Sequence, residues 1–152
     1  MFEETAANET VHAQEFLKLL QKLGGCSENL DIEAGYPYPL GDTRQNLGFA
    51  ARGELEEHTS VYPAFAELAR REGFPEAAQL WNLIGKIEGE HQRRFADLET
   101  QLCQGTRTKK QTPVVWKCLN CGHTYESKEA ALKCPVCGKG AGWQQEICPD
   151  KW

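Results

Sequence analysis

Ionisable side chains occupy the apolar stripes of three predicted helices, where a helical bundle normally places hydrophobic residues. Each stripe steps by three and four residues, the spacing that keeps side chains on one face of an α-helix. The stripes are Glu9, His12, Phe16, Leu19 and Leu23; Leu47, Ala51, Glu54, Val61, Phe65 and Leu68; and Ala77, Trp81, Ile84, Glu88, His91, Phe95, Leu98 and Leu102. Burying an ionised carboxylate without a partner is costly, and these stripes contain no Lys or Arg. We therefore predict that metal cations balance the charges.

Turn and capping residues predict where the helices begin and end. Gly24 is expected to end the first helix in a left-handed conformation. The second helix is expected to start at Asp42 or Thr43, either of which can cap it, and the third near Pro75, a favoured first-turn residue. Pro63 lies inside the second pattern and lacks a backbone N–H, so we expect a kink there.

The spacing of the ionisable residues is typical of metal ligands on helices. Three pairs lie one turn apart on one helix face: Glu9 with His12, Glu54 with Glu57, and Glu88 with His91. Glu-x-x-His pairs from two helices, with glutamates from the others, form the ligand set of carboxylate-bridged di-iron bundles. A single pair would be weak, whereas three pairs on packed faces favour metal binding. Solvated surface ion pairs are the alternative interpretation.

An internal repeat suggests that one helix of a four-helix unit is absent from this chain. The pattern E-x-x-H-x-x-x-F-x-x-L occurs at 9–19 and again at 88–98. Glu54 precedes the second copy by 34 residues, and an equivalent glutamate for the first copy would fall before Met1. We therefore expect three helices here. An upstream segment, a helix swapped from a second subunit, or degeneration of the site would each account for the gap.

Four cysteines near the C-terminus predict a second metal site. Cys118–Gly122 and Cys134–Gly138 are two Cys-x-x-Cys-Gly knuckles, with twelve residues between Cys121 and Cys134. The glycine of each knuckle can adopt the positive φ that the turn needs. Four thiolates give a tetrahedral site for iron or zinc, and the spacing does not distinguish the two ions. Trp116, Tyr125 and Trp143 flank the knuckles and are expected to form a small core.

The polar stretch 104–112 separates two expected domains, a helical one at 1–103 and a four-cysteine one at 113–152. Their net charges are −9 for 1–103 and +4 for 104–152, so the two parts could dock within one chain or between two copies. The basic part has no Arg-rich stripe, which argues against a nucleic-acid partner.

The N-terminus does not resemble a signal peptide, and no apolar run is long enough to span a membrane. We therefore expect a cytoplasmic protein without a membrane partner. In a reducing compartment the seven cysteines favour metal ligands or thiols over disulfides. Three of them lack partner spacing and are expected to be free thiols or core residues: Cys26, Cys103 and Cys148.

These residues together make the chain similar to the rubrerythrins, from Met1 to about Gln144. The stretch from Gly53 to Pro63, GELEEHTSVYP, continuing to Phe74, closely resembles the third-helix signature of that family. The resemblance implies a mainly α fold: a ferritin-like helical bundle followed by a small C-terminal β domain of the rubredoxin-like or zinc-ribbon type. The first helix of the family, which contributes a terminal glutamate, has no counterpart in this chain.

The resemblance also implies a role for each candidate residue. Glu9 and Glu88 would bridge two irons, Glu54 and His91 would bind one of them, and His12 and Glu57 would alternate on the other, with Tyr62 hydrogen-bonding nearby. We take Glu57, His12 and Tyr62 as the catalytic candidates. The metal candidates at the second site are Cys118, Cys121, Cys134 and Cys137, which would hold a single iron that feeds electrons to the di-iron centre.

The implied reaction is the reduction of hydrogen peroxide to water in defence against oxidative stress. The implied partners are an electron-donor protein or reductase that uses NAD(P)H and, in a homodimer, a second copy of the chain. The alternative is a non-enzymatic or degenerate metal-binding protein, in which a zinc knuckle and an incomplete bundle serve iron handling or a structural role.

Overall fold

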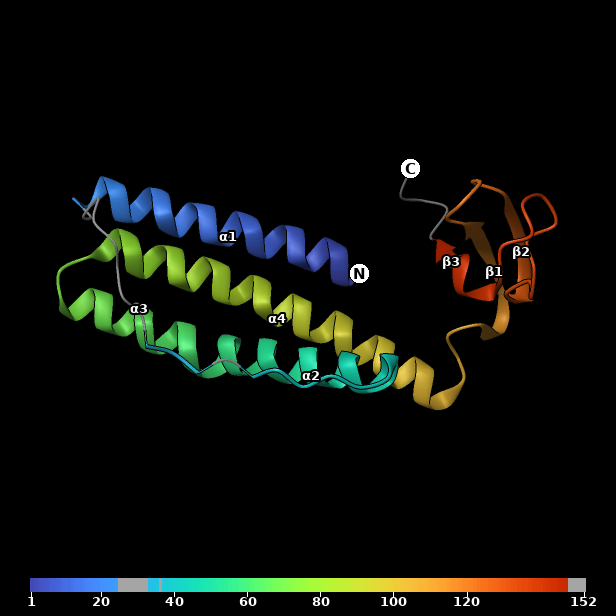
Figure 1. Cartoon of the computed structure of the whole chain (residues 1–152), viewed down its shortest axis with the longest axis horizontal. Coiled ribbons are helices and arrows are strands. Elements are labelled where there is room, and N and C mark those ends of the chain that lie inside the picture. The colour runs from blue at the N-terminus through green and yellow to red at the C-terminus, as the bar shows by residue number, and fades with distance from the viewer. Residues whose placement is uncertain (25–32, 36, 148–152) are drawn as a thin grey trace. The chain divides into compact units, whose positions relative to one another are not determined.

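The computed structural model describes residues 1–24, 33–35 and 37–147 and contains a helical unit and a small antiparallel sheet (Figure 1). The chain divides into two compact units, Met1–Asp97 and Leu98–Trp152. The helical elements are α1 (Phe2–Lys22), α2 (Thr43–Glu56), the π-helical turn η1 (Glu57–Val61), α3 (Tyr62–Arg71) and α4 (Pro75–Gln104). The others are β1 (Lys109–Cys118), β2 (Thr124–Glu129), the short 3₁₀ turn η2 (Ala141–Trp143) and β3 (Gln144–Ile147). The mainly α fold class is confirmed.

The helix ends follow the expected local chemistry. Gly24 and Gly73 each have φ of +86°, as left-handed residues after a helix require. Asp42 caps α2: its carboxylate accepts from the Gln45 N–H at 2.8 Å, and the Gln45 side chain accepts from the Asp42 N–H at 2.9 Å. Pro75 opens α4 as expected. None of the described helices is both long enough and apolar enough to cross a membrane.

The irregularity at Pro63 is a π-helical turn rather than a simple kink. Pro63 lies in the first turn of α3, directly after η1. Because proline has no N–H, the α-helical bond to Thr59 cannot form there, and the wider π turn accommodates the gap. A π turn adds one residue to the helix and so shifts the phase of every side chain after it.

This phase shift corrects the predicted stripe of the second helix. Leu47 and Ala51 are buried, but Phe65 and Leu68 are 44% and 41% exposed, while Ala66 is fully buried. The stripe drawn without a π turn therefore points to the wrong face beyond η1. Leu23 and Leu102, at the ends of the other stripes, are also partly exposed.

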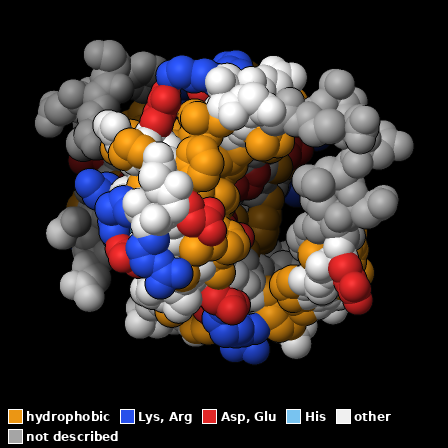
Figure 2. Space-filling model, turned by 90° about the vertical axis from the view of Figure 1, so that its left-hand side faces the viewer, with side chains coloured by type: hydrophobic (Ala, Val, Ile, Leu, Met, Phe, Trp, Pro, Cys, Tyr) orange, Lys and Arg blue, Asp and Glu red, His pale blue; other side chains and the backbone are white. Residues whose placement is uncertain are grey.

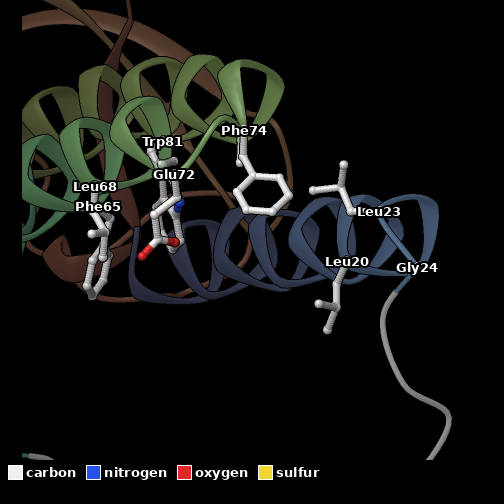
Figure 3. A pocket seen from close by; sticks show the side chains of 10 residues that line it. Leu20, Leu23, Gly24, Phe65, Leu68, Glu72, Phe74 and Trp81 are labelled. Atoms are coloured by element: carbon white, nitrogen blue, oxygen red, sulfur yellow. The ribbon is translucent and has the colours of Figure 1, made fainter.

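An apolar groove lies between α1 and α3, and Leu23, Phe65 and Leu68 line it. Figure 3 shows Phe74 between the leucines of α1 and the apolar residues of α3. The groove is lined by Leu20, Leu23, Phe65, Leu68, Phe74 and Trp81, among others. Hydrophobic side chains are also visible between charged ones on this end of the chain (Figure 2). With α2, η1 and α3 counted as one continuous helix, the helical unit has three helices among the described residues, and this groove is left uncovered between them.

Packing against α4 positions the other helices. Figure 1 shows α1 and the α2–α3 pair running along α4. Ion pairs at the two ends join α1 to α4, Glu4 with Arg94 at 2.6 Å and Lys22 with Glu76 at 2.5 Å. Such exposed pairs each contribute only about 0–1 kcal/mol. The main stabilisation comes from buried apolar residues: Leu47, Ala51, Ala66, Ala78, Ile84 and Phe95.

The second unit is a three-stranded sheet in the order β2-β1-β3, with both pairings antiparallel. Trp116 on the central strand is fully buried and donates its indole N–H to the Ser127 carbonyl at 3.0 Å. Tyr125 is partly buried, but Trp143 is 44% exposed, so the expected aromatic core lacks its third member. The Lys139 ammonium lies over the Trp143 ring instead.

The segment between α4 and β1 is shorter than the stretch 104–112 that was expected to be a linker. α4 ends at Gln104 and β1 begins at Lys109, so most of 104–112 belongs to regular elements. Of the three unassigned cysteines, Cys103 is exposed near the end of α4. Cys26 and Cys148 lie outside the described residues.

Candidate metal centres

Three helices bring four predicted ligands together. Glu9 of α1, Glu54 of α2, and Glu88 and His91 of α4 each place one ligand atom within 4.8 Å of all the others. Glu88 is fully buried and His91 nearly so. Glu88 and His91 therefore lie inside the bundle, as the sequence predicts, whereas the Glu9 side chain is 40% exposed.

Two of the carboxylates face both imidazoles. The His12 Nδ1 atom lies 3.0 Å from Glu9 Oε2 and 3.2 Å from Glu88 Oε1. The His91 Nδ1 atom lies 3.1 Å from the other Glu9 oxygen and 2.8 Å from the other Glu88 oxygen. The two imidazole rings are 6.0 Å apart between centroids. The centre thus has two poles, one at each histidine, and each of these carboxylates spans both.

The remaining glutamates divide between the two poles. Glu54 Oε2 lies 3.5 Å from the His91 Nδ1 atom and so belongs to the His91 pole. Glu57 is not among the four residues that converge; it is hydrogen-bonded to Tyr62 and interacts electrostatically with His12. The structure therefore brings Glu9, Glu54, Glu88 and His91 into one cluster and places His12 and Glu57 beside it.

The contacts around His91 cannot be explained by hydrogen bonds alone. Three carboxylate oxygens lie within 3.5 Å of its Nδ1 atom, yet one ring nitrogen can donate a single proton. Glu9 Oε1, Glu54 Oε2, both Glu88 oxygens and this nitrogen are buried without a hydrogen-bond partner among the described residues. Leaving a buried charged group unsatisfied costs at least about 1–3 kcal/mol. Lone pairs that converge in this way fit bound cations, so the residues fit a di-iron centre.

Without metal, the buried acids retain their protons. Burial and the neighbouring Glu9 carboxylate raise the pKa of Glu88 to about 9 and that of Glu54 to about 7. Burial also raises the pKa of Glu57 and lowers that of His91. Burial and the Glu57 carboxylate hold the pKa of Tyr62 far above its usual range, so Tyr62 remains a neutral phenol. The imidazole of His91 is therefore poised in its neutral, metal-binding form.

The two cysteine knuckles have the same backbone geometry. Gly122 and Gly138 have φ of +79° and +72°, as predicted. Their N–H groups donate to the carbonyls of Cys118 and Cys134 at 2.8 and 2.9 Å. Each knuckle therefore forms the same tight turn, with its two thiols on one side.

The four sulfur atoms are spaced for one tetrahedral ion. The Sγ atoms of Cys118 and Cys137 are 3.7 Å apart, and those of Cys121 and Cys134 are 3.6 Å apart. A disulfide requires about 2.05 Å, whereas the edge of a tetrahedron with metal–sulfur bonds of about 2.3 Å is roughly 3.7 Å. The Lys139 N–H donates to the Cys137 sulfur and lowers the pKa of that thiol to about 6, which favours the metal-binding thiolate.

One residue near the centre was not identified from the sequence. The His58 Nδ1 atom, on η1, lies 2.5 Å from the Gly85 carbonyl oxygen of α4. A possible signal was present in Gly85 and Gly89, because small residues four apart on a helix permit close approach of a neighbouring element. His58 does not fall on any of the predicted stripes.

A three-helix unit with a carboxylate/histidine centre, followed by a four-cysteine sheet unit, defines the class of ferritin-like proteins that carry a rubredoxin-type domain. The rubrerythrin family profile matches residues 1–99, and the profile of the rubrerythrin rubredoxin-like domain matches residues 116–142. The chain belongs to the rubrerythrin family. Its cofactors are those of the family: a di-iron centre held by carboxylates and histidines, and one ion held by four cysteines.

Individual relatives agree with this assignment. The chain is 47% identical to rubrerythrin of Clostridium perfringens over 139 residues, covering 90% of this chain and 70% of that protein. It is 37% identical to rubrerythrin of Nitratidesulfovibrio vulgaris, with the same coverage. Among solved structures, nigerythrin in a mixed-valence state superposes with a TM-score of 0.55 at 24% identity, covering 96% of this chain and 68% of that one. That structure supports the fold alone.

Metal uptake by the bundle should release protons. Below about pH 7 both Glu54 and Glu88 are protonated in the metal-free protein, and above about pH 9 both are ionised. Since the ionised forms bind metal, proton release should be greatest at the lower pH and the apparent affinity should rise with pH through this window. Calorimetric titration with Fe²⁺ in buffers of different ionisation enthalpy measures both quantities. The control is Glu88→Ala, and uptake without proton release below about pH 7 would contradict the prediction.

Proposed function

We propose that this chain reduces hydrogen peroxide to water at a di-iron centre in the helical unit, with electrons delivered through an iron in the four-cysteine site. The observation that carries the proposal is that Glu9 and Glu88 each face both imidazoles. Membership of the rubrerythrin family supports oxidoreductase chemistry. A pair of irons, when bound, would supply the two electrons that cleave the O–O bond.

The protein residues would divide the work of holding that pair. Glu9 and Glu88 would bridge it, and His91 would bind one iron together with Glu54. At the other pole His12 and Glu57 would be alternative ligands, because Glu57 lies outside the converged cluster and can be held away by Tyr62. His12 already contacts both bridging carboxylates.

Proton transfer would fall to Glu57 and Tyr62. Burial raises the pKa of Glu57 and so favours its protonated form, from which it would donate a proton to a departing oxygen. Tyr62 remains a neutral phenol and would orient the Glu57 carboxylate through their hydrogen bond. This assigns Glu57, His12 and Tyr62 as the residues that respond to each turnover.

Electrons would enter through Cys118, Cys121, Cys134 and Cys137, which would hold a one-electron iron site. We infer a homodimer, because the apolar groove leaves one face of the bundle uncovered and because the acidic and basic parts of the chain are complementary. A cytoplasmic reductase that uses NAD(P)H would be the electron source. Zinc in the cysteine site would make that site structural and colourless. Protein that is colourless and takes up no iron would therefore favour the non-enzymatic alternative.

Removing a buried bundle ligand should empty the bundle without affecting the cysteine site. Glu88→Ala removes a buried ligand that faces both histidines, and His91→Ala removes one of those histidines. Bundle iron should therefore fall from two per chain towards zero in each variant. Iron per chain, measured after anaerobic loading, should fall to the single cysteine-bound ion. Glu90→Ala is the matched control, because Glu90 lies on α4 but points to solvent and pairs with Arg93. Equal losses at both sites would show that the sites are not separate.

Removing a thiol ligand should separate electron delivery from peroxide chemistry. Cys137→Ser should lower steady-state peroxide reduction to near background, because the one-electron site is lost. A single oxidation of chemically reduced bundle iron by peroxide should proceed at the wild-type rate. Stopped-flow absorbance measures the single turnover, with Cys103→Ser as the control outside the four-cysteine site. Loss of the single turnover would contradict the assigned division of labour.

A further inference from the structure

We propose that His58 is a positioning residue that holds the π turn η1 against α4 and thereby keeps Glu57 within reach of the metal centre. The proposal rests on the di-iron centre of the proposed function. His58 does not act as a metal ligand in this proposal, because its ring nitrogen contacts the backbone of α4 and it is not part of the Glu/His cluster.

A hydrogen bond ties His58 to the α4 backbone. Its Nδ1 atom lies 2.5 Å from the Gly85 carbonyl oxygen, and because a carbonyl only accepts, the Nδ1 atom must carry the proton. In an α-helix this carbonyl already accepts from the N–H four residues later. Its second lone pair is free to accept the imidazole N–H. The bond therefore costs α4 none of its own hydrogen bonds.

Two glycines of α4 allow η1 and the start of α3 to approach closely. A Cβ atom on Gly89 would lie 2.9 Å from Cε1 of the His58 ring, and one on Gly85 would lie 3.2 Å from the Tyr62 Cβ atom. Neither glycine has a positive φ, so backbone conformation does not require them. Glycine in a helix interior costs about 1 kcal/mol relative to alanine. Gly89 makes room for the His58 ring and Gly85 for Tyr62, which indicates that η1 and the start of α3 need to lie close to α4.

The contact joins the neighbours of two candidate ligands. His58 directly follows Glu57 on η1, while Gly85 and Gly89 flank Glu88 on α4. Single π turns occur frequently at functional sites but are rare in helices overall. The hydrogen bond from His58 to α4 would fix how Glu57 is rotated about the helix axis and how far it lies from the metal centre. Without that bond, relaxation of η1 towards an ordinary α-helical turn would rotate Glu57 relative to the centre.

Three variants distinguish positioning from simple packing. His58→Asn keeps an N–H donor near the Nδ1 position but removes the ring, whereas His58→Phe keeps a ring over Gly89 and removes the donor. Gly89→Ala leaves His58 intact but displaces its ring. If His58 only fills space, His58→Phe should behave as wild type. If it positions Glu57, His58→Asn should be the variant that retains function.

The experiment is anaerobic loading of the full chain with ⁵⁷Fe²⁺, followed by Mössbauer spectroscopy. The spectra separate the cysteine-bound iron from the bundle irons. In His58→Phe and Gly89→Ala, one bundle iron should bind about tenfold or more weakly with an altered spectrum, the range expected when a partner that orients a ligand is lost. The other bundle iron and the cysteine-bound iron should be unchanged. His58→Asn should restore most of the wild-type affinity.

Several results would overturn the proposal. Wild-type affinity and spectra in His58→Phe would assign His58 a packing role only. Parallel weakening of both bundle irons with a lowered unfolding temperature would show a general fold defect. Wild-type protein that takes up no bundle iron would contradict the proposed function as well, whereas normal wild-type loading with unaffected variants would contradict the role of His58 alone. Peroxide turnover is not the readout, so failure of the proposed reaction leaves this test intact.

Discussion

The burial of Glu88 and its contacts with both histidines are the constraint on which the rest of the helical unit depends. Glu88 has no exposed surface, and neither of its oxygens has a hydrogen-bond partner among the described residues. Glu9 approaches the same two imidazoles from α1. Such an arrangement is unfavourable in an empty bundle and favourable around cations, so metal binding and the packing of α1 on α4 are coupled.

The four-cysteine unit also brings metal ligands close together, but it uses thiols on backbone turns instead of carboxylates on helices. Its ligands lie on two rigid turns whose glycines adopt positive φ, and backbone N–H groups stabilise the thiolates. The turns are joined to a small sheet whose buried core includes Trp116 and Gln144. The helical centre, in contrast, depends on the mutual placement of three helices, and its ligands come from separate parts of the chain.

Much of this architecture could be predicted from local patterns. The helical stripes placed Glu9, Glu54, Glu88 and His91 on faces that converge, and the Cys-Gly knuckles fixed the second site. Capping chemistry located the start of α2 and the ends of the helices. These features were accessible because each depends on residues close together in sequence.

Other features depended on contacts between distant residues. The π turn shifted the helix phase after Glu57, so Phe65 and Leu68 lie on the open face although their spacing matched the stripe. The role of His58 could not be predicted from the sequence, because its partner is a backbone carbonyl on another helix. Trp143 was expected in the core but pairs with a lysine at the surface. Periodicity gives the face of a regular helix and does not indicate where the regularity breaks.

The central claim is that Glu9 and Glu88 bridge two metal ions inside the helical unit. The most direct test is a crystal structure of iron-loaded protein with anomalous scattering recorded at the iron edge. We predict two anomalous peaks in the bundle, about 3.5–4 Å apart, one near His91 and Glu54 and the other near His12 and Glu57, with a third peak between the four cysteines. A bundle without anomalous density, or a single ion that contacts neither Glu9 nor Glu88, would contradict the account.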